Sequence, residues 1–311
     1  MNRRHFIKQS FLGSAGLYSL SAFPMEALAS REIVKLTILH TNDMHSHIDP
    51  FPANDPKYPG LGGMERRAAL INKIRKEEEN LLLLDAGDVF QGTPYFNLYG
   101  GELEFKLMSK MGYDACTIGN HDFDNGLNGL ARMLPHANFP FICANYDFSD
   151  TVMFDKTIPY KIFEKRGIRV GVFGLGIELD GLVGKKFYGN TIYQNPVEVS
   201  EKISRVLKED WKCDLVVCLS HLGFKYQTKK IDDMKLAKTS KYIDLIIGGH
   251  THSFLDEPVF LKNKNNKKVV INQVGWAGLR VGRIDFFLDR KTKKNVISGT
   301  GYIVNNFVNF G

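Results

Sequence analysis

Five apolar runs of strand length in this chain are followed by residue types that commonly bind metal ions. In each case His, Asp or Asn comes directly after the last apolar residue or a few positions later. Ligands of α/β proteins bind outside the carboxyl ends of the strands, where such residues would meet. The pattern therefore predicts an α/β fold that gathers carboxylates, imidazoles and one carboxamide at one edge. The five segments are Thr37–His45, Leu81–Asp88, Cys116–Asp122, Val216–His221 and Leu245–His252.

Amphipathic segments alternate with the apolar runs, which is typical of β-α-β units. Pro196 and the acidic residues after it suit the start of a helix. The expected strands are Val34–His40, Leu81–Asp85, Ala115–Ile118, Phe141–Ala144, Arg169–Leu175, Leu215–Leu219 and Leu245–Ile247. The expected helices are Glu65–Glu79, Glu102–Met111, Leu127–Leu134, Val197–Glu209 and Lys229–Thr239.

From Lys268 onward the alternation stops, because three apolar runs follow with polar turns and no helix between them. We expect Val269–Val274, Gly282–Leu288 and Val296–Val304 to close the chain as an antiparallel meander. The 311 residues have an ordinary globular composition, with 43% hydrophobic and 24% charged residues, and suffice for one large domain. Since no repeat or linker interrupts them, we expect a single compact domain over residues 30–311.

The charge of the chain argues against a nucleic-acid partner. The formal net charge is +7, of which residues 1–29 carry +2 and the remainder +5. A nucleic-acid-binding protein gathers Lys and Arg along one face, whereas the clusters here are short, such as Lys262–Lys268. We interpret the charge as a solvated surface that mildly attracts anionic substrates.

The N-terminal segment has the composition of an export signal. It begins with the basic pair Arg3 and Arg4, which resembles the twin-arginine type that directs folded proteins across a membrane. A weakly apolar run then covers Ser10–Phe23, and Ala27–Ala29 offers small residues for cleavage. The run is about 14 residues, short of the roughly 20 that span a bilayer, so we expect no stable membrane insertion. We interpret residues 1–29 as a signal peptide cleaved after about Ala29, which predicts a periplasmic or otherwise exported protein.

The four cysteines lie inside apolar, strand-like segments, and no pair has the Cys-x-x-Cys spacing. Cys213 and Cys218 are five residues apart along one such segment, about 16 Å at 3.3 Å per residue, which is too far for a disulfide. We therefore expect Cys116, Cys143, Cys213 and Cys218 to be buried free thiols. Free thiols agree with a protein that folds in the cytoplasm before export.

Each candidate site residue has an ordinary alternative interpretation when taken alone. Asp43 and His45 form a common loop pair, and residues 120–122 suit a helix cap. A lone His221 after a strand more often makes a hydrogen bond than binds a metal. The complete order Asp-x-His, Gly-Asp, Gly-Asn-His-Asp, His and Gly-His-x-His, however, leaves little room for these alternatives. Its mixed oxygen and nitrogen ligands indicate divalent Mn, Zn, Fe or Co rather than Ca or Mg alone.

This ordered set resembles the motifs of the calcineurin-like metallophosphoesterases. Within them, residues 38–45 (ILHTNDMH) and 119–126 (GNHDFDNG) are similar to the 5′-nucleotidase branch. The resemblance runs from about Ile33 to Asp285, which is nearly all of the chain after the leader. It implies a four-layer α/β/β/α sandwich that holds two metal ions.

The resemblance also implies roles for individual residues. Asp88 would bridge the two ions, since a carboxylate between them reduces their repulsion. Asp122 stands at a position where Glu is also common in this branch, and it would not be a ligand. The first metal would be held by Asp43, His45, Asp88 and His252, and the second by Asp88, Asn120, His221 and His250.

His121 and Asp124 match the catalytic pair of the family. Two metals about 3.5–4 Å apart would lower the pKa of a bound water and clamp phosphate oxygens, so that the hydroxide attacks directly. No Ser or Cys nucleophile is implied. His121 would neutralise or protonate the leaving oxygen, and Asp124, three residues further on, would orient the imidazole.

These expectations describe an exported hydrolase of phosphate monoesters, with 5′-nucleotides first among the substrates. Relatives in this branch usually carry a second, C-terminal domain that binds the nucleotide, and this sequence stops at Gly311. A separately encoded nucleotide-binding domain would supply that function, or the enzyme would accept a broader set of small phosphoesters. Gly92–Phe96 and the Trp276 region would either stack on a substrate or pack within the protein.

Two other functions compete with this one. A cyclic-nucleotide phosphodiesterase or nucleotide-sugar pyrophosphohydrolase would use the same site, and the sequence does not separate them from the first hypothesis. A catalytically inactive binding subunit of a two-chain nucleotidase is the alternative from another class. The complete ligand set and the His121/Asp124 pair argue against it, because a protein without turnover has no need of them.

Overall fold

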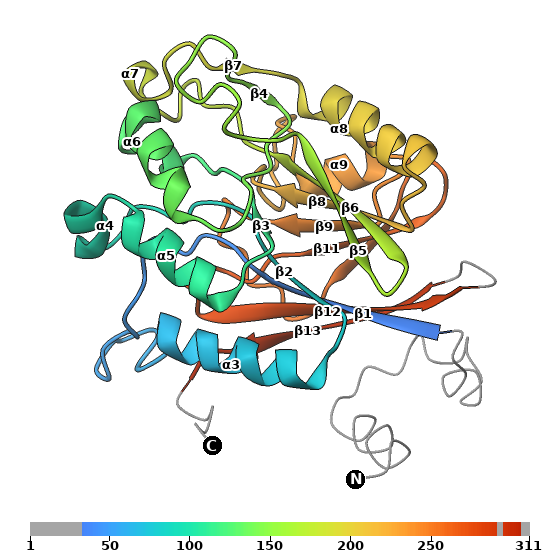
Figure 1. The fold of residues 1–311 in the computed structure, drawn as a ribbon, viewed down its shortest axis with the longest axis horizontal. Helices are drawn as coiled ribbons and strands as arrows, with labels where there is room; N and C mark the ends of the chain where they lie inside the picture. Colours follow the sequence, from blue (N-terminus) through green and yellow to red (C-terminus); the bar gives the residue numbers. More distant parts are fainter. Residues whose placement is uncertain (1–32, 291–294, 306–311) are drawn as a thin grey trace.

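The computed structural model describes residues 33–290 and 295–305. They form two β-sheets that pack face to face, with helices on the outer face of each sheet (Figure 1). The α/β/β/α sandwich expected from the sequence is therefore confirmed. The predicted signal peptide, residues 1–29, lies outside the described residues.

The first sheet has five strands in the order β13-β12-β1-β2-β3. Its central strand β1 runs parallel to β2 and antiparallel to β12. β2 is rich in Leu and wholly buried, because layers cover both faces of the sheet. The strands are β1 (Ile33–Thr41), β2 (Leu81–Asp85), β3 (Ala115–Cys116), β12 (Arg280–Asp289) and β13 (Asn295–Ile303).

The second sheet has six strands in the order β10-β11-β9-β8-β6-β5. Its four inner strands are parallel, whereas the edge strands β5 and β10 are antiparallel to their neighbours. The strands are β5 (Tyr160–Lys165), β6 (Ile168–Leu175), β8 (Leu215–Ser220), β9 (Leu245–Gly248), β10 (Val259–Lys262) and β11 (Lys268–Asn272). A separate pair consists of β4 (Tyr146–Asp147) and β7 (Ile192–Tyr193).

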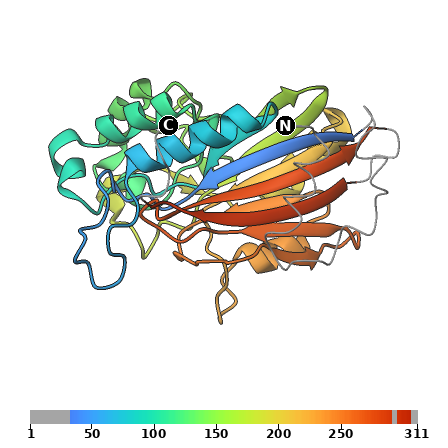
Figure 2. The same ribbon diagram turned by 90° about the horizontal axis from the view of Figure 1, so that it is seen from below.

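Helices α3, α5 and α6 cover the first sheet, and α8 and α9 cover the second. Figure 2 shows α3 lying along the first sheet beside β1. The helices are α3 (Met64–Glu77), α4 (Pro94–Tyr99), α5 (Glu102–Met111), α6 (Gly126–Met133), α7 (Lys185–Tyr188), α8 (Pro196–Arg205) and α9 (Asp233–Thr239). The short turns η2 (His121–Phe123) and η3 (Leu134–His136) are 3₁₀, and η4 (Val206–Asp210) is a π-helical continuation of α8.

Aliphatic side chains fill the space between the two sheets. Ile38 and Leu82 point into it from the first sheet, and Val172, Val217 and Ile247 point into it from the second. All five are fully buried. This layer holds the sheets against each other, so the loops that follow β1, β2, β8 and β9 come together on one side of the molecule.

Several predicted elements are wrong in their extent. Phe141–Ala144 is not a strand. Phe141 makes one isolated bridge to Cys116 and Ile142 makes one to Ile158, so no continuous ladder of strand hydrogen bonds forms. α9 begins at Asp233 rather than Lys229, since the side chain of Asp232 caps it and accepts the N–H of Lys235. The strand predicted over Ala115–Ile118 ends at Cys116.

The predicted C-terminal meander is also wrong, because its first strand joins the other sheet. β11 lies parallel to β9 in the second sheet, whereas β12 and β13 pair antiparallel in the first. Residues 273–279 cross from one sheet to the other between them. Alternating buried side chains in β11 fill both the inter-sheet core and the outer core under α9, which explains this placement.

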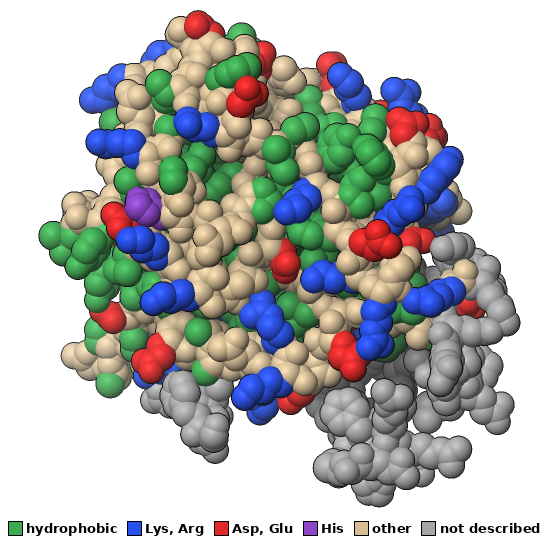
Figure 3. Space-filling view, in the orientation of Figure 1, with side chains coloured by type: hydrophobic (Ala, Val, Ile, Leu, Met, Phe, Trp, Pro, Cys, Tyr) green, Lys and Arg blue, Asp and Glu red, His purple; other side chains and the backbone are tan. Residues whose placement is uncertain are grey.

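The prediction for the cysteines agrees with the structure. All four cysteines are free and buried, as expected. On the face drawn in Figure 3, Lys and Arg side chains are interspersed with acidic and apolar ones and form no continuous stripe. Within residues 33–290 and 295–305, no helix has the length and apolar character needed to cross a membrane.

Candidate metal centre

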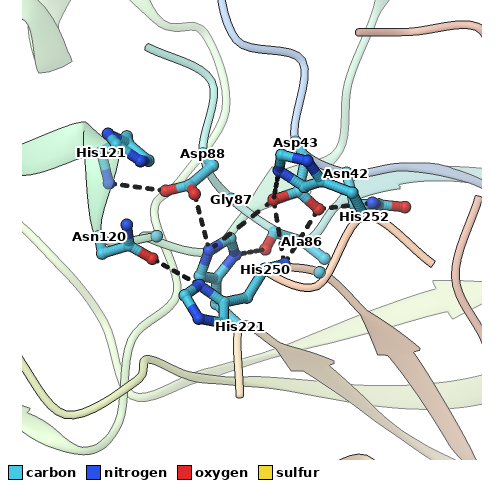
Figure 4. Close-up of polar contacts among 12 residues, drawn as sticks. Asn42, Asp43, Ala86, Gly87, Asp88, Asn120, His121, His221, His250 and His252 are labelled. Atoms are coloured by element: carbon cyan, nitrogen blue, oxygen red, sulfur yellow. Dashed lines mark hydrogen bonds and ion pairs between the residues drawn. The ribbon is translucent and has the colours of Figure 1, made fainter. Parts of the chain in front are cut away.

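The seven predicted metal ligands converge at the carboxyl ends of strands from both sheets, and Figure 4 labels all of them except His45. The first sheet contributes four of them and the second sheet three. Two groups of Asp and His side chains form, each with its ligand atoms within 4.8 Å of one another. The ligands are Asp43 and His45 after β1, Asp88 after β2, Asn120 after β3, His221 after β8, and His250 and His252 after β9.

The first cluster consists of Asp43, His45 and His252. The Nε2 atoms of the two imidazoles lie 3.0 Å apart, and Nε2 of His252 lies 3.5 Å from Oδ1 of Asp43. The side chains of Asp43 and His45 are buried, whereas that of His252 is 40% exposed. This cluster therefore faces solvent through one of its ligands.

The second cluster consists of Asp88, His221 and His250. Nε2 of His221 lies 3.0 Å from Oδ2 of Asp88. Oδ1 of Asn120 lies 2.7 Å from Nδ1 of His250, so the predicted carboxamide ligand joins this group. His221 and Asp88 are almost completely buried and His250 is half-buried, so each cluster has two buried members and one partly exposed imidazole.

Asp88 lies between the two clusters. Its Oδ2 atom is 3.0 Å from Nε2 of His221 in the second cluster and 3.9 Å from Nε2 of His45 in the first. Its other oxygen, Oδ1, accepts the backbone N–H of His121 at 2.7 Å. The carboxylate of Asp88 therefore lies within 4 Å of imidazole nitrogens from both groups.

Hydrogen bonds to carbonyl oxygens set the tautomers of two imidazoles. Nδ1 of His45 lies 3.2 Å from the carbonyl oxygen of Phe90, and Nδ1 of His221 lies 2.7 Å from that of Ala86. A carbonyl only accepts, so Nδ1 carries a proton and Nε2 faces the cluster, where it would bind a metal once deprotonated. Imidazole lone pairs and carboxylates aimed at a common space fit divalent transition metals.

Burial and close charges shift the pKa values of the second cluster. Burial acts to lower the pKa of His221, but the adjacent Asp88 outweighs it and raises that pKa to about 10. Burial acts to raise the pKa of Asp88, but His221 holds it below its ordinary range. For His250, burial dominates and lowers the pKa to about 4. Asp88 therefore stays ionised, as a metal-bridging carboxylate must.

Five of the seven ligands have a left-handed backbone. The φ angles are 50° for Asp43, 46° for His45, 56° for Asp88, 71° for His250 and 50° for His252. Residues other than Gly rarely adopt such angles, which cost about 1–3 kcal/mol each and cluster at functional sites. The fold thus holds these side chains in strained loops that direct them toward the two clusters.

Two glycines allow the ligand-bearing loops to approach closely. A Cβ atom on Gly119 would lie 2.1 Å from Oδ1 of Asp88, and one on Gly249 would lie 2.8 Å from Nδ1 of His221. Real Cβ atoms do not come so near, so any side chain at these positions would displace a ligand. Gly119 and Gly249 therefore precede Asn120 and His250 for a steric reason.

Asp122 supports the loop that carries Asp88. Its buried carboxylate accepts the backbone N–H groups of Gly119, Asp88, Val89 and Phe90, at 2.8–3.2 Å. The sequence also assigns it no role as a metal ligand. Its structural role, however, could not be read from the motif, because the four N–H groups come from two separate loops.

Asn42 and Gln273 connect the loops of the two sheets. The side-chain amide of Asn42 donates to Oδ2 of Asp43 at 2.6 Å and accepts the backbone N–H of Val274 at 3.0 Å. Nε2 of Gln273 donates to the carbonyl oxygen of Gly249 at 2.6 Å, next to His250. Sequence analysis missed both residues, although Asn42 lies inside the quoted motif.

The predicted pair His121 and Asp124 is formed at the edge of the centre. Nδ1 of His121 lies 2.9 Å from Oδ2 of Asp124, and this hydrogen bond raises the pKa of His121 above its ordinary value. The imidazole is 38% exposed and lies with its ring centroid 5.2 Å from that of His45. An imidazole of raised pKa is thus presented to solvent beside the first cluster.

Of the two aromatic segments noted in the sequence, one reaches the centre. The indole of Trp276 stacks on His252, with 5.6 Å between ring centroids and 6° between ring planes. Phe96 instead packs in the core against Phe90. Thr93, in the same segment, supports the loop after His45 by donating to the carbonyl oxygen of Ser46 at 2.8 Å.

Comparison with known proteins agrees with this geometry. The family model of the calcineurin-like phosphoesterases matches residues 36–254. The chain belongs to the calcineurin-like phosphoesterase family. Members of this family are metal-dependent hydrolases with a dinuclear metal site, and the two Asp/His groups stand where such a site would lie. The resemblance drawn from the motifs is thereby confirmed.

The most similar curated proteins include 5′-nucleotidases. The snake venom 5′-nucleotidase of Gloydius brevicauda is 32% identical over 86% of this chain and 47% of that protein. The trifunctional nucleotide phosphoesterase protein YfkN of Bacillus subtilis is 32% identical over 82% of this chain and 18% of that protein. The crystal structure of a 5′-nucleotidase precursor from Thermus thermophilus has a TM-score of 0.80 at 31% identity, covering 88% of this chain and 55% of that one. The chain thus spans about half the length of the venom and Thermus proteins.

Proposed function

We propose that this chain is the catalytic domain of an exported two-metal phosphomonoesterase whose preferred substrates are 5′-nucleotides. The observation that carries the proposal is the place of Asp88, which lies between two clusters of His and Asp side chains. In this proposal Asp43, His45, Asp88 and His252 hold one divalent ion. Asp88, Asn120, His221 and His250 hold the other, and the ions are Mn, Zn, Fe or Co.

The bound ions would supply a water of lowered pKa and positive charge for the phosphate oxygens. The chain itself would handle the leaving group. His121, whose pKa is raised by the hydrogen bond to Asp124, lies beside the first cluster and would hold a proton near the leaving oxygen. Asp124 accepts from Nδ1 and so keeps Nε2 of the imidazole turned toward the substrate.

The names of the relatives support nucleotides as the substrate class. Two of those compared are 5′-nucleotidases and the third is a nucleotide phosphoesterase. The trifunctional Bacillus protein is named a nucleotide phosphoesterase without restriction to 5′-monoesters, so hydrolysis of cyclic nucleotides or nucleotide sugars at the same site is the second candidate. We propose that a separately encoded nucleotide-binding domain narrows the specificity, and that the chain alone accepts other small phosphoesters.

A phosphoester panel tests these proposals. Protein reconstituted with Mn or Zn would be given 5′- and 3′-nucleotides, cyclic nucleotides, a UDP-sugar and an aryl phosphate. We expect the highest kcat/KM among monoesters for 5′-nucleotides. Faster turnover of the cyclic nucleotides or the UDP-sugar would favour the second candidate. Intact metal binding without turnover of any ester would identify a binding subunit.

Export is proposed from Arg3, Arg4 and the small residues at Ala27–Ala29. Changing both Arg to Lys should leave the protein in the cytoplasm, as measured by fractionation. Unchanged translocation of this double variant would indicate the general secretory route instead. The mature N-terminus, determined by mass spectrometry, should follow Ala29, and an intact Met1 on exported protein would contradict cleavage.

A further inference from the structure

His252 differs from the other ligands of its cluster in how its ring is held. Its side chain is 40% exposed, whereas that of His45 is 6% exposed. His45 fixes its ring with a hydrogen bond from Nδ1 to a backbone carbonyl. In the part of the chain that the structure describes, no carbonyl oxygen fixes the ring of His252, whose Nε2 lies 3.0 Å from Nε2 of His45.

The indole of Trp276 covers one face of that imidazole. The planes of the two rings are almost parallel, with 6° between them, and the ring centroids lie 5.6 Å apart. The same indole also makes an edge-to-face contact with His45, with 6.4 Å between the ring centroids and 65° between the ring planes. A stacked ring restricts the rotation of its neighbour, and a cationic ring gains further attraction from an indole face.

Trp276 is itself held by neighbouring rings. His47, Phe51 and Tyr58 present edges or faces to it at centroid distances of 5.2, 6.0 and 6.3 Å, with ring planes inclined by 65° or more. All three come from the segment that follows β1 and carries His45. The indole therefore has little freedom to leave its position against His252.

The backbone around Trp276 is tied to both ligand-bearing segments. Ala277 donates its N–H to the carbonyl oxygen of Asp43 at 2.7 Å, and Gly275 donates to that of Ser253 at 3.0 Å. The carbonyl oxygen of Gly275 accepts from the side chain of Asn42 at 2.6 Å. The turn is thus anchored next to Asp43 on one side and next to His252 on the other.

From these contacts we infer that Trp276 is a positioning residue of the metal centre, which holds His252 by ring stacking in place of the usual hydrogen bond. This role rests on the proposed function, because it requires that His252 bind a metal. Loss of a residue that orients a ligand typically weakens metal binding by about 10- to 100-fold. The effect should be confined to the first cluster, since Trp276 contacts no ligand of the second.

Metal titration tests the inference without reference to activity. The chain has two Trp residues, Trp211 and Trp276, and Trp211 lies near the start of β8, at the opposite end of the sheet. In a Trp211→Phe background the fluorescence of Trp276 should change when Mn²⁺ is added, because the metal-binding imidazole touches the indole. A Trp276→Phe variant, which retains Trp211, should show no such change.

Affinities measured by competition with a fluorescent chelator complete the test. Trp276→Ala should bind one Mn²⁺ about 10- to 100-fold more weakly and leave the other nearly unchanged. Trp276→Phe should restore most of the loss, and Trp211→Ala should match the wild type. Wild-type affinity at both sites in Trp276→Ala would overturn the inference, as would an equal loss in Trp211→Ala. A raised KM with unchanged metal affinity would also overturn it, because Trp276 would then contact the substrate. Failure of the wild type to bind metal would instead refute the proposed function.

Discussion

The two clusters of the candidate metal centre differ in how their ligands are held. In the second cluster His221 is fully buried and its Nδ1 donates to a carbonyl oxygen. In the first cluster His252 faces solvent and is covered by the indole of Trp276. The comparison teaches that hydrogen bonds to carbonyl oxygens hold His45 and His221, one imidazole in each cluster, whereas ring stacking holds the exposed His252. We therefore expect the second cluster to bind its ion more tightly, because its ligands are better pre-organised.

Replacing the shared carboxylate should have the largest effect. Asp88→Asn keeps the size of the side chain but removes the charge that both clusters use. We expect the metal content of reconstituted protein to fall from about two ions toward none, with loss of turnover. Elemental analysis after reconstitution with Mn or Zn measures this. Retention of one tightly bound ion would show that Asp88 belongs to a single cluster.

Removal of the predicted acid should separate chemistry from metal binding. His121→Ala should keep both ions and lower kcat by roughly 10²–10⁴ for a nucleoside monophosphate. The loss should be smaller for an aryl phosphate, whose leaving group is stable without a proton. Loss of metal in this variant would make His121 a ligand, and equal losses for both esters would assign it to the attacked phosphoryl group.

Asp122→Ala should lower the stability of the fold and weaken metal binding in the second cluster. It leaves buried N–H groups near Asp88 without an acceptor, at a cost of about 1–3 kcal/mol for each group that stays unsatisfied. We expect a clearly lower melting temperature in calorimetry and weaker binding in the second cluster than in the first. Asp147→Ala, which removes an exposed turn carboxylate, serves as the control. An unchanged melting temperature would show that water replaces the carboxylate.

The smallest effect is expected at Asp124. Asp124→Asn should misorient His121 without removing it, so kcat should fall by about tenfold or less, below the loss in His121→Ala. Metal content of both clusters should equal that of the wild type. Steady-state kinetics on a nucleoside monophosphate provide the measurement, and a loss as large as that of His121→Ala would mean that the imidazole works only when paired.

Much of the site could be predicted because each ligand follows a strand within a few residues. Asp88 after β2 and His250 after β9 are examples, since an apolar run predicts the strand and the strand end predicts the position. Edge elements were harder to predict. β5 has half-exposed residues that lack an apolar run, and Phe141–Ala144 is apolar but makes only isolated bridges. In both cases the neighbouring segments, not local composition, decide whether a ladder forms.

The sequence by itself determined which residue types stand at the strand ends and the order of the motifs, because these depend on neighbours along the chain. Only the tertiary structure decided that His45 and His252, 207 positions apart, bring their Nε2 atoms to 3.0 Å. It also decided that β11 enters the second sheet, so that residues 273–279 cross between the sheets and place Trp276 on His252. The physical reason is that these contacts require the two sheets to pack through their shared aliphatic layer, which no local pattern encodes.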